Sequence, residues 1–138
     1  MSIAEGTTRL KTLRGSYDFA VDGGAISTIT LRSNDGDIPL GSVILGGYID
    51  VLTLLTSGGA STVAVQAEAA NDLQTAITVA GAPWSTAGRK VIVPVISTPS
   101  TYIKTTAARN LKIVIAAFTV TAGKFDVVLF YILSLIHI

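Results

Sequence analysis

The supply of β-branched residues is the feature that most limits how this chain can fold. Val, Ile and Thr together make up about a third of the sequence, and their restricted χ1 angles suit extended strands. Glycine-rich turns interrupt the apolar runs roughly every 8 to 15 positions, as in sandwiches with many short strands. We therefore predict an all-β fold: a single-domain antiparallel β-sandwich, jelly-roll-like, with eight or nine strands.

Two glycine pairs have specific structural interpretations. Asp22-Gly23-Gly24 separates apolar runs at residues 16–21 and 25–31, and Asp-Gly between such runs predicts a hairpin because both turn residues tolerate positive φ. Residues 42–56 read as one long strand that contains Gly46-Gly47. A double glycine inside a strand predicts a bulge or bend.

Further strands are expected downstream. Residues 60–69 alternate between apolar and polar side chains, which is typical of a half-solvated antiparallel strand. Residues 70–72 read as a turn before a short strand at 73–79, with one helical turn over 68–75 as the alternative. Residues 89–96 predict an edge strand because they contain Pro94. Residues 111–121 and 124–133 predict a final hairpin joined by Ala122-Gly123.

This predicted last hairpin is apolar on both of its faces. Strands of that kind are covered on both sides, and a small sandwich has only one interior. The sequence therefore predicts a subunit interface, because obligate interfaces resemble a domain core. The alternative is that loops fold over the second face. The residues assigned to this interface are Val114, Phe118, Val120, Val128, Phe130 and Ile132.

The residues that enzymes need are scarce. The chain has no Cys and one His, at position 137, so thiolate chemistry, His-based metal sites and Ser-His triads have no basis. The acids are scattered one per element, and none of the glycine-rich spots has phosphate-loop spacing. We expect no enzyme, no cofactor and no metal site.

Charge and hydropathy also restrict the partners. The net charge is +1 and charged residues are 14% of the chain. The chain therefore has no overall positive charge that would attract nucleic acid or an anionic membrane. The longest apolar run, at residues 127–138, falls short of the roughly 20 residues that span a bilayer. It is interpreted as a buried strand followed by a tail.

Trp84, the only tryptophan, follows Pro83 in an expected loop. We expect it to have a structural or subunit-contact role and treat it as a candidate surface contact, with sugar stacking as the alternative. Arg9, Lys11 and Arg14 make the start of the chain basic, either as an arm that docks on an acidic neighbour or as a solvated terminus. The expected organisation is an N-terminal arm (1–15), a sandwich domain (16–133) and a C-terminal tail (134–138).

From residue 10 to residue 133 the pattern of turns and strands resembles a group of small virion proteins of tailed bacteriophages. The elements that carry this resemblance are Tyr17 to Gly24, Ile38-Pro39 leading into Gly47 to Val51, Leu55 to Ala60, Gly81 to Ser85, Lys104 to Arg109 and Thr121 to Phe125. The resemblance implies a phage structural protein, and some similar proteins decorate or cement capsids. It transfers no functional residue.

The end of the chain departs from that pattern. Similar sequences stop soon after Tyr131, whereas this chain continues to Ser134-Leu135-Ile136-His137-Ile138. The added string looks like translated sequencing-adaptor read-through, which implies a metagenomic origin and a non-native tail. A genuine last half-strand is the alternative.

The function expected from the sequence is therefore a capsid decoration or cement subunit located in the virion. Its expected partners are further copies of itself, with a trimer favoured, and the phage capsid protein. The alternative is a carbohydrate- or receptor-binding module on a phage tail or capsid surface.

Overall fold

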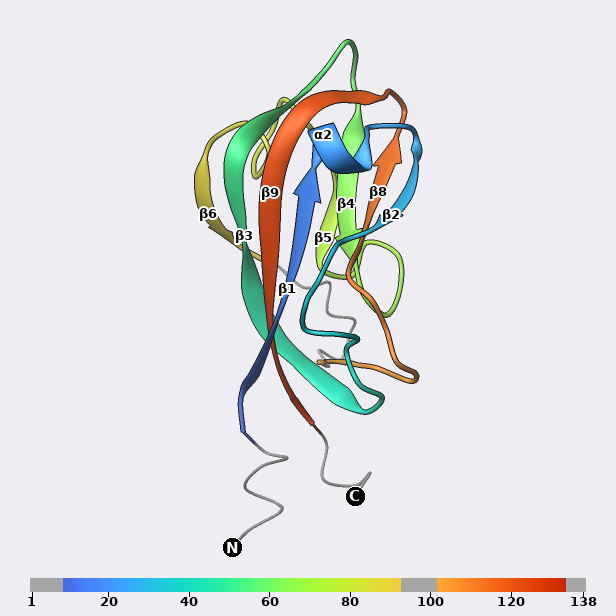
Figure 1. The fold of residues 1–138 in the computed structure, drawn as a ribbon, viewed down its shortest axis with the longest axis vertical. Coiled ribbons are helices and arrows are strands. Elements are labelled where there is room, and N and C mark those ends of the chain that lie inside the picture. The colour runs from blue at the N-terminus through green and yellow to red at the C-terminus, as the bar shows by residue number, and fades with distance from the viewer. Residues whose placement is uncertain (1–8, 93–101, 134–138) are drawn as a thin grey trace, which may run out of the picture.

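The computed structural model describes residues 9–92 and 102–133, and nearly every ordered element in it is a strand (Figure 1). In chain order the elements are β1 (Lys11–Asp18), α2 (Phe19–Asp22), β2 (Ser27–Thr30), β3 (Ser42–Ser57), β4 (Thr62–Gln66), β5 (Gln74–Thr78), β6 (Gly88–Val91), β7 (Ile103–Lys104), β8 (Lys112–Ala116) and β9 (Val120–Leu133). The all-β prediction is confirmed.

The strands form two antiparallel sheets packed face to face. Sheet A has the order β1-β9-β3-β6, with β7 also pairing with β3, and sheet B has the order β2-β8-β4-β5. Figure 1 shows the two layers, with β6 and β2 on opposite flanks. Because β1 pairs with β9 from Lys11 opposite Tyr131 onwards, the first and last strands start and end at the same end of the sandwich. The predicted β-sandwich of about nine strands is confirmed.

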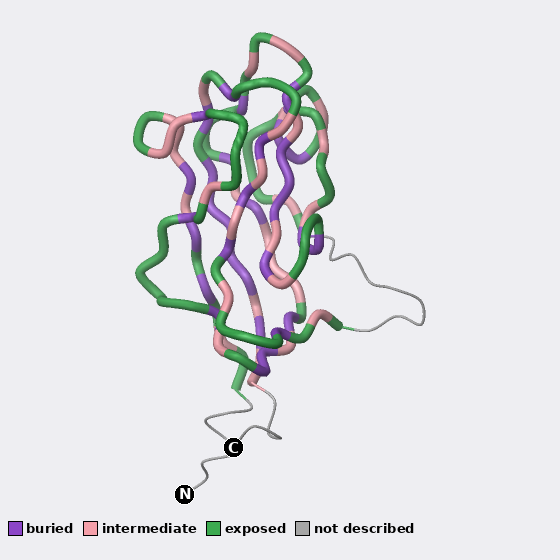
Figure 2. Tube along the Cα trace, turned by 90° about the vertical axis from the view of Figure 1, so that its right-hand side faces the viewer, coloured by how far each residue is buried: buried purple, intermediate pink, exposed green. Residues whose placement is uncertain are grey.

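The core lies between the two sheets, and Figure 2 shows it as buried stretches along the strands. Strand β9 illustrates the pattern, because Phe125, Val127 and Leu129 are each fully buried on its inner face. Aromatic rings fill the centre: the ring centroids of Tyr17 and Phe125 are 5.2 Å apart, and those of Trp84 and Phe125 are 4.9 Å apart. Such tilted pairs add to the stabilisation from apolar burial.

The glycine pair in β3 produces the predicted bulge. The register of β3 against β9 shifts between Ile44 and Gly46, so the long strand continues past the irregularity. Any side chain at position 47 would destabilise the fold, because a Cβ there would lie 2.1 Å from the carbonyl oxygen of Val128. The strand therefore bends where two backbones approach closely.

The predicted hairpin at Asp22-Gly23-Gly24 is wrong. Strand β2 pairs with β8 in sheet B, whereas β1 belongs to sheet A. Asp18 caps the one-turn helix α2 by accepting from the N–H of Ala20, and Gly23 (φ 77°) donates back to the Phe19 carbonyl. A Cβ on Gly24 would lie 1.9 Å from the Val120 carbonyl oxygen. Gly23 therefore ends helix α2, and Gly24 allows two backbone segments to approach closely. Neither glycine forms a hairpin turn.

The predicted last hairpin is also wrong. Strand β8 pairs with β2 and β4, and β9 pairs with β1 and β3. Ala117, at φ 70°, redirects the chain from one sheet to the other. Ala122 and Gly123 continue β9 instead of forming a turn. The two strands therefore lie in different sheets and contact the same core from opposite sides.

Other boundaries shift by a few residues. Strand β1 begins at Lys11, within the segment expected to be an arm. The turn at residues 70–72 is present, and no helix forms over residues 68–75. The expected strand at 89–96 is β6, Gly88–Val91. Pro94 and the tail 134–138 lie outside the described residues.

Candidate interaction surface

Two features are absent from the part of the chain that the structure describes. Within residues 9–92 and 102–133, no three acidic or imidazole side chains gather closely enough to hold a metal ion. No helix in that part of the chain is long and apolar enough to cross a membrane.

The outer face of sheet A carries an apolar surface built by strand register. Val128 lies opposite Tyr48, which in turn lies opposite Val91, and Ile132 lies opposite Val43. Phe130 lies opposite Gly46, and its ring centroid is 6.1 Å from that of Tyr48. Val91 is 76% exposed. We call this set the apolar face: Val43, Tyr48, Val91, Val128, Phe130 and Ile132.

A polar row crosses the same outer face next to the apolar one. Strand register places Ser16, Asp126, Asp50 and Arg89 side by side on β1, β9, β3 and β6. Carboxylates directly opposite each other repel, so Asp50 and Asp126 need compensating charges. Arg89 lies 3.9 Å from Asp50, and Arg14 forms an ion pair with Asp126.

Asp126 is 6% exposed although it lies on the outer face. The hydroxyl of Ser16 donates to it at 2.7 Å, and the Arg14 guanidinium covers it. The hydrogen bond to Asp126, followed by its charge, raises the pKa of Arg14 above its ordinary value. The row therefore presents fixed charges of both signs at the border of the apolar face.

A polar hollow of about 400 Å³ lies beside β1, lined by Arg14, Ser16, Arg32, Ser33, Asn34 and Asp35. Arg32 donates to both carboxylate oxygens of Asp22, at 3.0 and 3.1 Å. Burial pushes the pKa of Asp22 up, but the hydrogen bonds from Arg32 and the Asp18 amide outweigh it, so the pKa lies below its ordinary value. The guanidinium groups at this hollow already have carboxylate partners.

The structure brings together only some of the residues predicted to form an interface. Val128, Phe130 and Ile132 share the apolar face. Val114 lies on β8 in sheet B, opposite Thr28 and Ala64. Phe118 is 51% exposed in the β8–β9 connection, where its ring lies against Gly59.

Val120 is a correction to the predicted set. It is 1% exposed and belongs to the core between the sheets. The sequence pattern placed it with Phe118 because it assumed an unbroken strand over 111–121, whereas Ala117 ends that alternation. An interface role for the residues on the apolar face stays a prediction.

Trp84 does not form a surface contact. Its side chain is fully buried, and its indole Nε1–H donates to the Val63 carbonyl at 3.2 Å. Its ring packs on Phe125. It therefore offers no exposed face to a sugar or a partner. The sequence analysis placed Trp84 in a loop, but it did not predict that this loop closes over the core.

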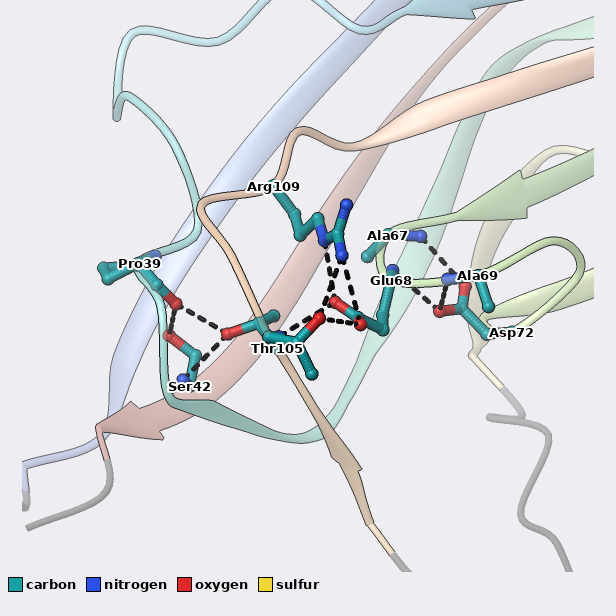
Figure 3. Close-up of polar contacts among 9 residues, drawn as sticks. Pro39, Ser42, Ala67, Glu68, Ala69, Asp72, Thr105 and Arg109 are labelled. Atoms are coloured by element: carbon teal, nitrogen blue, oxygen red, sulfur yellow. Dashed lines mark hydrogen bonds and ion pairs between the residues drawn. The ribbon is translucent and has the colours of Figure 1, made fainter. Parts of the chain in front are cut away.

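A polar network that the sequence analysis missed joins loops at one end of the sandwich, and Figure 3 shows its contacts. Arg109 forms two hydrogen bonds with Glu68, at 2.7 and 3.2 Å, and the Thr106 hydroxyl also donates to Glu68 at 2.7 Å. The Asp72 carboxylate accepts three backbone N–H groups, from residues 67, 68 and 69. The Arg109 hydrogen bond is the main cause that lowers the pKa of Glu68.

The same network reaches the other sheet. The Thr105 hydroxyl accepts from the Ser42 N–H at 2.9 Å and donates to the Pro39 carbonyl at 2.7 Å. Ser42 begins β3 in sheet A, whereas Glu68 follows β4 in sheet B. The segment that contains Thr105 and Arg109 therefore ties the two layers together.

Comparison with known proteins shows what the fold resembles. No family model and no curated protein matches the chain. Three solved structures are similar: the cyanophage Pam1 capsid asymmetric unit (20% identity, TM-score 0.62, 91% of this chain and 86% of that chain), the acidic stable capsid of Helicobacter pylori bacteriophage KHP30 (10%, 0.60, 90% and 87%) and the capsid of Ralstonia phage GP4 (19%, 0.64, 93% and 86%). Across nine-tenths of its length, this chain has the fold of a chain found in each of these phage capsids.

Proposed function

We propose that this chain is a structural protein of a bacteriophage virion, a subunit that decorates or cements the capsid. The observation that carries the proposal is the shared fold with chains of three phage capsid structures. Each similarity spans at least 86% of the matched chain as well as at least 90% of this one. The matched chains are therefore about the size of this chain.

The apolar face is the surface proposed to contact the capsid protein. Phe130 and Ile132 are only partly buried, and covering such a side chain fully contributes up to roughly 1.5–3 kcal/mol. The neighbouring charges of Asp50, Arg89 and Arg14 would orient the contact, since charges at an interface border select partner and register. Because the apolar face lies on strands whose conformation is already fixed, binding through it would cost little conformational entropy.

Further features belong to the same proposal. The order β1-β9-β3-β6 against β2-β8-β4-β5 supports a jelly roll. The protein acts in the virion as a homo-oligomer, with a trimer favoured because closed cyclic assemblies fit symmetric shells. It needs no cofactor, nucleic acid or membrane, and no catalytic role is proposed. The origin in environmental DNA and the non-native tail remain proposals.

The carbohydrate-binding alternative has lost its main support. It depended on an exposed Trp84, and that side chain is buried in the core. Trp84 is the only tryptophan in the sequence, so no tryptophan offers a face on which a sugar ring could stack. A glycan array with the purified protein tests this alternative directly, and reproducible sugar binding would favour it over a cement role.

The test of the proposed function uses shells assembled from the capsid protein of the same genome. The wild-type protein should pellet with the shells and raise their melting temperature. Phe130→Asp combined with Ile132→Asp should abolish pelleting, because two charges would be buried at the contact. Val21→Asp is the matched control, since Val21 is 65% exposed on α2, and it should bind like the wild type. Failure of the wild type to bind would overturn the proposal.

A further inference from the structure

The ion pairs on the outer face of sheet A turn their positive ends toward the solvent. In the pair of Arg89 and Asp50, the arginine side chain is 77% exposed and the aspartate side chain 24%. In the pair of Arg14 and Asp126, the corresponding values are 62% and 8%. A partner that approaches this face therefore meets the guanidinium groups first, with the carboxylates behind them.

Strand register places both arginines at the border of the apolar face. Arg14 on β1 lies opposite Val128 on β9. Arg89 lies on β6 two residues before Val91, and alternate residues of a strand point to the same side of a sheet. Both side chains therefore leave the sheet on the same outer face as the apolar residues.

A third cation, Lys104, borders the apolar face at the end farthest from the polar row. It lies on β7 opposite Val43, which in turn lies opposite Ile132, and its side chain is exposed. The four ion pairs found within residues 9–92 and 102–133 do not include Lys104. Exposed positive charges therefore stand at three places around the apolar face, on β1, β6 and β7.

The two guanidinium groups keep hydrogen-bond donors for a partner. Arg14 donates to Asp126 from Nη2 alone. The Nε of Arg89 lies 3.9 Å from the Asp50 carboxylate, which is too far for a hydrogen bond. A guanidinium carries five N–H donors in a fixed fork and can bind a carboxylate through two parallel hydrogen bonds. The fork of Arg89 is therefore available to a second carboxylate.

We propose that the apolar face binds an acidic surface of the capsid protein, whose carboxylates pair with Arg89, Arg14 and Lys104 around an apolar centre. The inference rests on the proposed function for the identity of the partner. Coulomb attraction falls with distance, so a carboxylate bound to an outer guanidinium gains more from it than it loses to the aspartate behind. The centre favours a protein over nucleic acid, because Val91 and Phe130 need apolar groups to cover them and a phosphate backbone supplies none.

The test is a pelleting titration with shells assembled from the capsid protein of the same genome. The dissociation constant should rise between about 50 and about 500 mM NaCl, because salt screens exposed charges. Arg89→Gln and Lys104→Gln should each weaken binding about two- to fivefold. The double variant should weaken it about tenfold, since distant sites add, and should depend less on salt than the wild type does.

Lys112→Gln is the matched control. It removes one positive charge from the outer face of sheet B, where Lys112 lies opposite Thr30 and Gln66, and it should bind like the wild type. Asp50→Asn should have the opposite effect and tighten binding about twofold, because it removes the carboxylate behind Arg89. A gain in affinity cannot arise from loss of folded protein, so this variant tests the charge itself.

The outcomes separate the acidic partner from the proposed function. Weaker binding by both cation variants, with tighter binding by Asp50→Asn, supports the acidic partner. Pelleting that does not respond to salt, or that Arg89→Gln and Lys104→Gln leave unchanged or strengthen, overturns it while the proposed function stands. Retention of duplex DNA with the same dependence on Arg89 overturns it in favour of nucleic acid. Wild-type protein that does not pellet at all overturns both proposals.

Discussion

Replacing Trp84 with phenylalanine tests whether the loop that carries it closes the core. The substitution removes the hydrogen bond from Nε1 to the Val63 carbonyl and shortens a ring that packs on Phe125. A hydrogen bond of this kind contributes about 1 kcal/mol net. The lost apolar contact and the residual cavity add about 1–2 kcal/mol.

The free energy of unfolding should therefore fall by about 2–3 kcal/mol, a drop of about 7–10 °C in Tm for a chain of this length. Urea denaturation followed by far-ultraviolet circular dichroism measures it without relying on the tryptophan. Thr86→Ala, at an exposed position two residues along, is the control and should change stability by less than about 0.5 kcal/mol. A Trp84→Phe variant as stable as that control would show that the indole is not packed as described.

Fluorescence of the wild-type protein gives an independent check of the same geometry. Trp84 is the only tryptophan, so its emission is unambiguous. A fully buried indole should emit at short wavelength and resist quenching by acrylamide until urea unfolds the chain. Efficient quenching of the native protein would contradict the burial of Trp84 and would reopen its role as a surface contact.

Two further predictions follow from the titrating groups. Arg109→Met should lower the free energy of unfolding by about 1 kcal/mol at pH 7, as measured by urea denaturation. Because the pKa of Glu68 is lowered in the folded state, the ion pair stabilises the protein above the usual carboxyl pKa range, and this stabilisation disappears as pH falls. An equal loss of stability at pH 3 would refute the ion pair. Burial, with smaller contributions from Asp22 and Asp18, raises the pKa of Tyr17 to about 12. The unfolded tyrosine ionises near pH 10, so stability should fall by roughly 2–3 kcal/mol as pH rises through 12, and Tyr17→Phe should flatten that decline in alkaline melts.

Local sequence patterns predicted the parts of the fold that depend on local chemistry. Alternation in β4, the glycine pair in β3 and the turn at residues 70–72 each follow from neighbouring side chains and backbone freedom. The outer face of β9 was also predictable, because Val128, Phe130 and Ile132 alternate with core residues inside one unbroken strand. These features need no knowledge of the partner strand.

The errors come from pairings between distant residues. An Asp-Gly turn and a helix end have the same local composition, and only the sheet that β2 joins decides between them. Ala117 adopts a positive φ without being glycine or asparagine, so nothing in the sequence marked the end of β8. The burial of Trp84 likewise depends on Val63 and Phe125, which are 21 and 41 positions away along the chain.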